Sequence, residues 1–121
     1  GVVGVKEVSE EAIQRYSSLK VEPLHDNWFT CTDMIEKPSK DKIMSLYSIL
    51  GRCVLPPQIF DILAHTAPGA GGEIQLTDAL DAVLAEEEMY AVVISDEDGF
   101  DTGTVETWLD TNNKLYARKN G

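Results

Sequence analysis

Runs of β-branched and apolar residues alternate with segments of helical character along most of this chain, and this alternation limits the folds open to it. The runs typical of strands are residues 2–8, 17–22, 29–35, 47–55 and 89–95. The segments typical of helices are residues 9–16, 39–44, 57–66, 76–88 and the stretch from 104 onward. Strands that alternate with helices pack in layers, so we expect an α/β fold in which helices flank a sheet.

Proline and glycine mark where these elements stop or bend. Pro23 should end the second strand and Pro38 the third, because proline cannot donate a hydrogen bond to a sheet. Lys37 precedes a proline and is therefore expected to be extended. Gly51 lies inside a strand-like run, which indicates a β-bulge or the close approach of another backbone.

The size and charge of the chain exclude several classes of function. Its 121 residues make at most one domain, or part of a larger one. A formal net charge of −11 leaves too few clustered cations for a broad nucleic-acid or anionic-membrane surface, so we expect neither partner. No apolar run is long enough to span a bilayer, and no segment has the pattern of a secretory leader.

The two cysteines bear on the cellular compartment of the protein, and the first residue bears on whether the boundary of the chain is natural. Cys31 and Cys53 lack the spacing of a metal site, and we expect reduced, buried thiols in a cytoplasmic protein. The chain begins at Gly1 and enters a strand-like run at once, from which we expect a cut or engineered boundary.

The pair Glu36 and Lys37 is the first candidate for binding chemistry. A lysine ammonium can neutralise a sugar phosphate, and a neighbouring carboxylate can accept hydrogen bonds from sugar hydroxyls. Adjacent strand residues point to opposite faces, so both reach one ligand only at a strand end, which Pro38 supplies. Taken alone, the pair is equally consistent with a solvated strand end.

Asp101 is the second candidate, within the sequence Phe-Asp-Thr-Gly-Thr. It could cap the helix that Thr104 enters, by accepting from backbone N–H groups. It could instead hold Mg²⁺, which proteins usually bind through one or two carboxylates together with substrate phosphate and water. The nearby acids at 96–98 lack the pattern of a calcium loop, and we expect a solvated turn there.

A glycine-rich stretch, Gly69–Gly72, precedes the helix expected from residue 76. Such a loop can bind phosphate through backbone N–H groups, but this one matches neither the Walker-A nor the dinucleotide pattern. We expect an ordinary turn whose backbone lies close to the sugar-binding pocket.

Taken together, these segments resemble the bacterial UTP–glucose-1-phosphate uridylyltransferases. Pro68–Leu80 is close to identical with the long motif of that family, and it is the most specific part of the resemblance. Glu36–Pro38 and Phe100–Gly103 match two shorter motifs in the same order, and Gly51–Leu55 resembles the family's Gly-Arg-Tyr-Val-Leu. The resemblance extends over nearly the whole chain.

The resemblance implies both a fold and a reaction. The fold would be part of a Rossmann-like, glycosyltransferase-A-like mixed sheet flanked by helices. Residues 1–121 would form a single partial domain, the sugar-phosphate-binding C-terminal half, without the N-terminal nucleotide-binding half. The reaction would transfer a uridylyl group from UTP to glucose 1-phosphate, giving UDP-glucose and pyrophosphate, with Mg²⁺ as cofactor. Transfers of this kind depend on positioning and charge neutralisation.

The resemblance also implies roles for individual residues. Glu36 would accept hydrogen bonds from the glucose hydroxyls, and Lys37 would contact the sugar phosphate as the catalytic cation. Asp101 would be one of two aspartates that hold Mg²⁺. Leu50 and Gly51 would lie along the sugar through their backbones.

Two departures from the family pattern affect these expectations. Ser17 stands where the family has a glycine that approaches the sugar, so its side chain could crowd the pocket or shift the choice of donor. The family's early Gly-x-Gly-Thr-Arg phosphate loop, its uridine-contacting residues and its first metal-binding aspartate have no counterpart in this sequence. We therefore expect the chain alone to be inactive.

Two other functions stay open from the sequence. One is a non-catalytic module that binds a sugar phosphate. The other is a related nucleotidyltransferase with another nucleotide or sugar, because the base is read by the half that has no counterpart here. A sheet without its other half exposes an edge and an apolar face, so we also expect a homo-oligomer or a rearranged packing.

Overall fold

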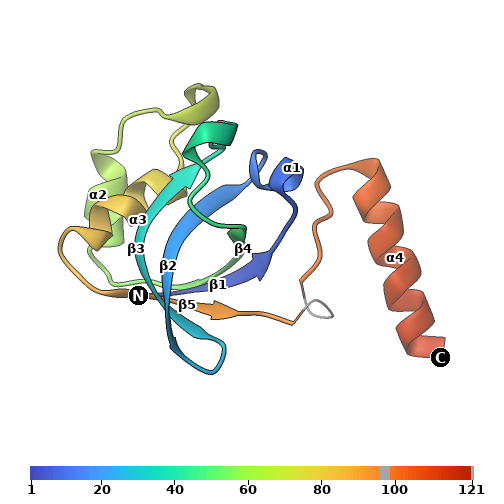
Figure 1. Ribbon diagram of the computed structural model, residues 1–121. Helices are drawn as coiled ribbons and strands as arrows, with labels where there is room; N and C mark the ends of the chain where they lie inside the picture. Colours follow the sequence, from blue (N-terminus) through green and yellow to red (C-terminus); the bar gives the residue numbers. More distant parts are fainter. Residues whose placement is uncertain (96–98, 121) are drawn as a thin grey trace.

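The computed structural model describes residues 1–95 and 99–120 as an α/β fold built on one mixed sheet (Figure 1). Its strands are β1 (Val2–Glu7), β2 (Ser17–His25), β3 (Trp28–Glu36), β4 (Tyr47–Val54) and β5 (Met89–Val93). Its α-helices are α1 (Glu10–Ile13), α2 (Ile59–Ala64), α3 (Leu76–Leu84) and α4 (Val105–Asn120). Two short 3₁₀ helices are η1 (Lys40–Lys42) and η2 (Ala70–Gly72). The expected alternation of strands and helices is confirmed.

The five strands lie in the order β2-β3-β5-β1-β4. β1 runs parallel to β5, and the other three neighbouring pairs are antiparallel. β2 and β4 are therefore the two outermost strands of the sheet. They nevertheless approach each other at one end, where the Ser17 N–H donates to Ser48 Oγ at 3.1 Å. The sheet is thus strongly curved, and this curvature brings the starts of β2 and β4 together.

The core lies between one face of the sheet and the α2–α3 pair (Figure 1). Helix α3 supplies the largest helical contribution, because its apolar positions recur on the face that packs against β3. The buried apolar residues are Val3, Val5, Leu19, Cys31, Met34, Ile59, Ala79, Leu80, Val83, Met89 and Ala91. On the opposite face a shallow apolar hollow of about 270 Å³ lies over β1, β4 and β5, and Val54 at its rim is 73% exposed.

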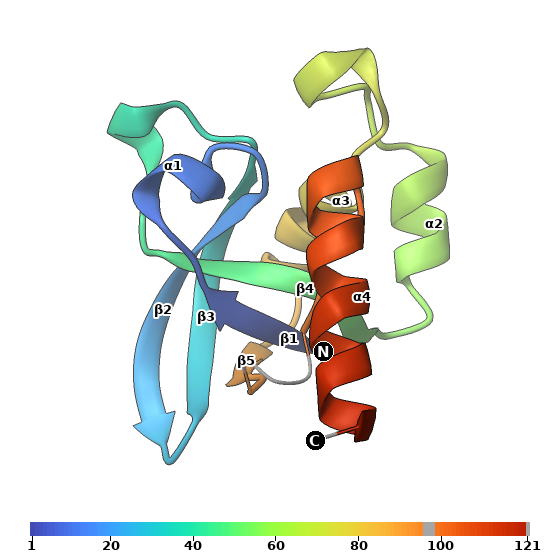
Figure 2. The ribbon, with the colours of Figure 1, turned by 90° about the vertical axis from the view of Figure 1, so that its right-hand side faces the viewer.

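Helix α4 stands apart from this core. Figure 1 shows it beyond the sheet, after residues 99–104, and Figure 2 shows it in front of the other elements when that side is viewed directly. No helix within residues 1–95 and 99–120 is both long enough and apolar enough to cross a membrane.

Two expectations about the strands and thiols are wrong. β2 does not end at Pro23 but continues to His25, because β2 is an edge strand and an edge position does not require every N–H group. Cys53 is exposed, whereas Cys31 is buried as expected. Cys53 is exposed because it follows the bulge of β4 at the edge of the sheet. Cys31 is buried, and this burial raises the pKa of its thiol to about 11.

We expect Leu80→Ala to lower the free energy of unfolding by about 2–5 kcal/mol, because it leaves a cavity at a site where the side chain is only 1% exposed. Leu76→Ala, on the same helix but 43% exposed, should cost less than about 1 kcal/mol. Urea denaturation followed by circular dichroism measures both values. Equal losses for the two variants would contradict the assigned core face of α3.

Candidate functional site

A cavity of about 390 Å³ opens beside the curved end of the sheet. Strand β4 forms one wall, β1 and α1 form the floor, and the segment before α4 forms the other wall. The lining residues are Lys6, Val8, Ala12, Tyr16, Ser48, Ile49, Leu50, Gly99, Phe100 and Asp101. The cavity therefore brings together residues from both ends of the chain, including the predicted Leu50 and Asp101.

Asp101 is held at this cavity by two hydrogen bonds to its carboxylate. The Tyr16 hydroxyl donates to Oδ2, and the Gly103 N–H donates to Oδ1 at 2.9 Å. These bonds favour the ionised carboxylate, so the pKa of Asp101 lies below its ordinary value of 3.8, with the Tyr16 bond as the larger cause. The same bond raises the pKa of Tyr16 above 10.0. Asp101 is thus a fixed, ionised carboxylate at the mouth of the cavity.

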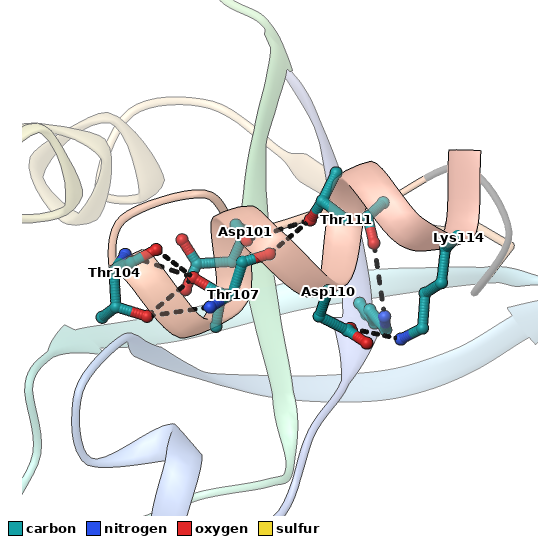
Figure 3. Close-up of polar contacts among 8 residues, drawn as sticks. Asp101, Thr104, Thr107, Asp110, Thr111 and Lys114 are labelled. Atoms are coloured by element: carbon teal, nitrogen blue, oxygen red, sulfur yellow. Dashed lines mark hydrogen bonds and ion pairs between the residues drawn. The ribbon is translucent and has the colours of Figure 1, made fainter. Parts of the chain in front are cut away.

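Asp101 is not the N-cap of α4. The Thr104 hydroxyl caps the helix by accepting from the Thr107 N–H at 3.1 Å, and the Thr107 hydroxyl accepts from the Thr104 N–H in return (Figure 3). The Thr111 hydroxyl lies within 3.4 Å of the Asp101 carbonyl oxygen, which ties α4 to the segment that carries Asp101. The Asp101 carboxylate is therefore not used by the helix end.

Glu36 and Lys37 lie at the end of β3, as their spacing predicts. Glu36 is the last residue of the strand, and its Oε2 accepts from the Thr77 hydroxyl of α3 at 2.6 Å. Lys37 is exposed, and its N–H donates to the Tyr16 carbonyl oxygen at 2.6 Å. Neither side chain lines the cavity, but Lys37 is bonded to Tyr16, which does.

The expectation that Lys37 is extended is wrong, because its φ is +47°. This left-handed conformation turns the chain sharply at the strand end, and the bond to the Tyr16 carbonyl oxygen holds that turn. A non-glycine residue in this region carries strain, which the surrounding contacts must offset.

Ser17 is only 3% exposed, and its hydroxyl does not line the cavity. It accepts from the Ile49 N–H at 3.1 Å and lies 3.2 Å from Ser48 Oγ, and both partners are lining residues. The Ser17 hydroxyl thus holds the part of β4 that lines the cavity, although Ser17 itself is not a lining residue. Gly51 has φ +67° with open space where a Cβ would lie, and the β1–β4 register shifts around it, which confirms the expected bulge.

The glycine-rich turn 69–72 does not line the cavity, although its backbone was expected close to the sugar pocket. It packs instead on α3, where a Cβ on Gly69 would lie 2.1 Å from Asp78 Oδ2. Asp78 occupies the first turn of α3. The acids at 96–98 lie outside the described residues.

Two cavity residues were not identified from the sequence. Tyr16 ends the expected helix at 9–16 and Lys6 lies in the expected strand at 2–8, and neither residue was assigned a role in the site from the sequence. Lys6 Nζ lies 3.4 Å from the Gly99 carbonyl oxygen, so it adds a cation beside the wall of the cavity. The sequence holds no local signal for Tyr16, because its contact with Asp101 joins residues 85 positions apart. Lys6 is followed by Glu7 at the end of a strand, which by itself indicates only a solvated strand end.

The donor set around Asp101 fits Mg²⁺ through one carboxylate. Each Asp101 oxygen accepts one hydrogen bond in the structure and keeps a further lone pair. Within residues 1–95 and 99–120, no three His, Cys, Asp or Glu side chains are grouped as metal ligands. These residues would therefore offer a magnesium ion the carboxylate of Asp101, and magnesium usually adds a second carboxylate, substrate phosphate or water.

Comparison with known proteins identifies the fold and the family. The profile of the family described as nucleotidyl transferase matches residues 3–118. This chain belongs to the nucleotidyl transferase family. A crystal structure of UDP-glucose pyrophosphorylase in complex with UDP-glucose superposes on 97% of the chain with a TM-score of 0.88 and 33% identity, and the chain covers 44% of that protein.

Curated relatives give the same result. A UTP–glucose-1-phosphate uridylyltransferase of Pseudomonas aeruginosa is 35% identical over 115 residues, which are 95% of this chain and 41% of the relative. The UTP–glucose-1-phosphate uridylyltransferase 2 of Staphylococcus saprophyticus is 40% identical over 90 residues, which are 74% of this chain and 31% of the relative. The chain thus spans less than half the length of these nucleotidyl transferases.

We expect Tyr16→Phe to raise the pKa of Asp101 towards its ordinary value, because the variant loses the larger of the two bonds that favour the carboxylate. In the unsubstituted chain this bond stabilises the fold at pH values above the ordinary pKa of an aspartate carboxyl group. This stabilisation is lost as the pH falls through the lower pKa of Asp101 in the folded state. A titration followed by the ¹³C shift of the Asp101 carboxyl measures the change. Tyr90→Phe is the matched control, because it removes a 2.6 Å bond to Glu88 instead and should leave Asp101 unchanged.

Proposed function

We propose that this chain is the sugar-phosphate-binding part of an enzyme that transfers a uridylyl group from UTP to glucose 1-phosphate. Family membership and the names of the relatives support this reaction. The observation that carries the proposal is the position of Tyr16, whose backbone oxygen binds the turn at Lys37 and whose hydroxyl binds Asp101. The backbone of the turn at Lys37 and the carboxylate of Asp101 thus both contact one residue that lines the cavity.

In this proposal the ammonium of Lys37 neutralises the phosphate of glucose 1-phosphate. Lys37 is exposed and follows the last residue of β3, so its long side chain can reach a ligand without leaving solvent. Glu36 has one oxygen on the Thr77 hydroxyl, which fixes the carboxylate and leaves the second oxygen for a sugar hydroxyl. Leu50 and Gly51 present their backbone to the sugar at the bulge of β4.

Asp101 would hold the catalytic Mg²⁺, which would offset the repulsion between the two anionic substrates. Tyr16 keeps the Asp101 carboxylate in place and ionised. In the reaction a phosphate oxygen of glucose 1-phosphate forms a bond to the α-phosphorus of UTP, and the bond from that phosphorus to pyrophosphate breaks. Such a step depends on charge neutralisation more than on covalent help.

A cytoplasmic location is part of the same proposal. Cys31 and Cys53 are both free thiols in the structure, and free thiols are typical of a reducing compartment.

We expect Lys37→Ala to weaken the binding of glucose 1-phosphate to the chain by about 10- to 100-fold, because a charge-assisted contact of about 1.5–3 kcal/mol is lost. Isothermal titration calorimetry measures the affinity. Lys40→Ala is the matched control, since Lys40 is an exposed lysine nearby whose ammonium pairs with Glu10 at 3.3 Å. Equal affinities for the two variants would remove Lys37 from the proposed site.

We also expect the 121-residue chain to release no pyrophosphate from UTP, glucose 1-phosphate and Mg²⁺, because it spans only about two fifths of the length of its relatives. A coupled pyrophosphate assay with purified chain tests this. Release of pyrophosphate would show that the chain is a complete catalyst. Binding of glucose 1-phosphate without turnover would agree with a binding part.

A further inference from the structure

Ser48 of β4 carries a buried hydroxyl on the cavity side of the sheet. Successive residues of a strand point to opposite faces, and the two neighbours of Ser48, Tyr47 and Ile49, pack against the core. The Ser48 side chain therefore points away from the core. It is one of the residues that line the cavity, although it is only 1% exposed. In the β1–β4 pairing Ser48 lies opposite Lys6, which is also a lining residue.

The Ser48 oxygen receives its hydrogen bonds from Ser17. The Ser17 N–H donates to Ser48 Oγ at 3.1 Å, and the two Oγ atoms lie 3.2 Å apart. The Ser17 oxygen accepts in turn from the Ile49 N–H at 3.1 Å. In the part of the chain that the structure describes, these are all the hydrogen bonds that the two hydroxyl groups make.

The two hydroxyl groups have two protons, but only one of these protons fits between the two oxygens. The other proton has no acceptor among the described residues. If Ser48 were the donor, the remaining proton would belong to Ser17, which is 3% exposed and does not line the cavity. A buried donor without an acceptor is destabilising. Ser17 is therefore the donor, and Ser48 keeps a proton that it can donate into the cavity.

We propose that Ser48 is a specificity-determining residue, whose hydroxyl donates to one hydroxyl oxygen of the sugar. This inference rests on the proposed function, because it takes the ligand of the cavity to be the sugar phosphate. Leu50, the next residue on the same face of β4, is assigned there to the sugar and not to its phosphate. Ser17 is then a positioning residue, because its hydroxyl occupies an acceptor position of Ser48 and turns the Ser48 proton outward.

A buried donor of this kind selects among sugars. A ligand that carries a hydroxyl group at this position accepts the Ser48 proton, whereas a ligand without one displaces water and leaves the donor unpaired. The chain should therefore prefer sugar 1-phosphates that carry this hydroxyl group over analogues that lack it.

Isothermal titration calorimetry with glucose 1-phosphate and its 2-deoxy, 3-deoxy, 4-deoxy and 6-deoxy analogues tests this preference. The unsubstituted chain should bind the analogue that lacks the partner of Ser48 about 5- to 50-fold more weakly than glucose 1-phosphate. Ser48→Ala should abolish this difference and leave the differences for the other analogues unchanged. If Ser48→Ala lowers the affinity for every sugar phosphate by the same factor, Ser48 acts on the structure or on the phosphate, and the proposal is overturned.

Ser18→Ala is the matched control for the loss of a buried serine at this end of the sheet. The Ser18 hydroxyl accepts from the N–H groups of Met44 and Ser45 and donates to the Ser45 carbonyl oxygen, so its proton is already used. Ser18 does not line the cavity. Its substitution should therefore leave every ratio of affinities unchanged, and a ratio that changes as in Ser48→Ala would overturn the proposal.

The same measurements separate this proposal from the proposed function. A chain that binds none of these sugar phosphates overturns both. Binding of glucose 1-phosphate with a preference that survives Ser48→Ala overturns only the role of Ser48. Neutron diffraction from crystals of the deuterated chain gives a readout that needs no ligand. The deuteron between the two oxygens should belong to Ser17, and a Ser48 deuteron in that position would overturn the proposal.

Discussion

The predicted binding end of this molecule depends on the placement of one residue, Tyr16. Its carbonyl oxygen accepts from the Lys37 N–H, and its hydroxyl donates to the Asp101 carboxylate. Tyr16 lies between α1 and β2, where the Tyr16 N–H in turn donates to the Ile13 carbonyl oxygen. The Ser9 hydroxyl caps α1 by accepting from the Ala12 N–H, so a single helical turn sets the position of Tyr16. The turn after β3 and the segment before α4 are both positioned through that residue.

Buried serines support the same end of the sheet. Ser17 and Ser48 join the two outermost strands through their hydroxyls, and Ser18 accepts from the N–H groups of Met44 and Ser45. Among the described residues, no buried side-chain nitrogen or oxygen atom lacks a partner. Buried hydroxyls contribute to stability only when their hydrogen bonds are made, so these contacts fix the curvature as well as permit it. The part of β4 that lines the cavity is therefore held in place by hydrogen bonds to buried serines.

The sequence predicted the elements well, because their signals are local. The periodicity of α3 and α4, the bulge at Gly51 and the helix beginning near Leu76 depend on neighbouring residues and are confirmed. Pro23 was misjudged because its effect depends on whether its strand lies at an edge, which only the sheet order determines. The strained turn at Lys37 was also missed, since it is set by a bond to the Tyr16 carbonyl oxygen rather than by the proline that follows.

The site could be predicted only in part for the same reason. Resemblance to a family identified Glu36, Lys37 and Asp101, and the structure places Lys37 and Asp101 around Tyr16. The role of Tyr16 itself could not be read from the sequence, because its partners lie on other elements. Ser17 illustrates the converse case. Its position suggested a group that crowds a pocket, but its hydroxyl is used to fasten two strands together.

The curved sheet also affects how the protein behaves at high concentration. An exposed outer strand is a template for fibrillar aggregation, because its free N–H and carbonyl groups can recruit another chain. Here the start of β2 is fastened to β4, and its far half contains Pro23 directly after Glu22 and ends at His25. The outer strand β4 is bent by the bulge at Gly51, and the exposed Arg52 follows that glycine within the strand. Both borders of the sheet therefore resist adding a further strand.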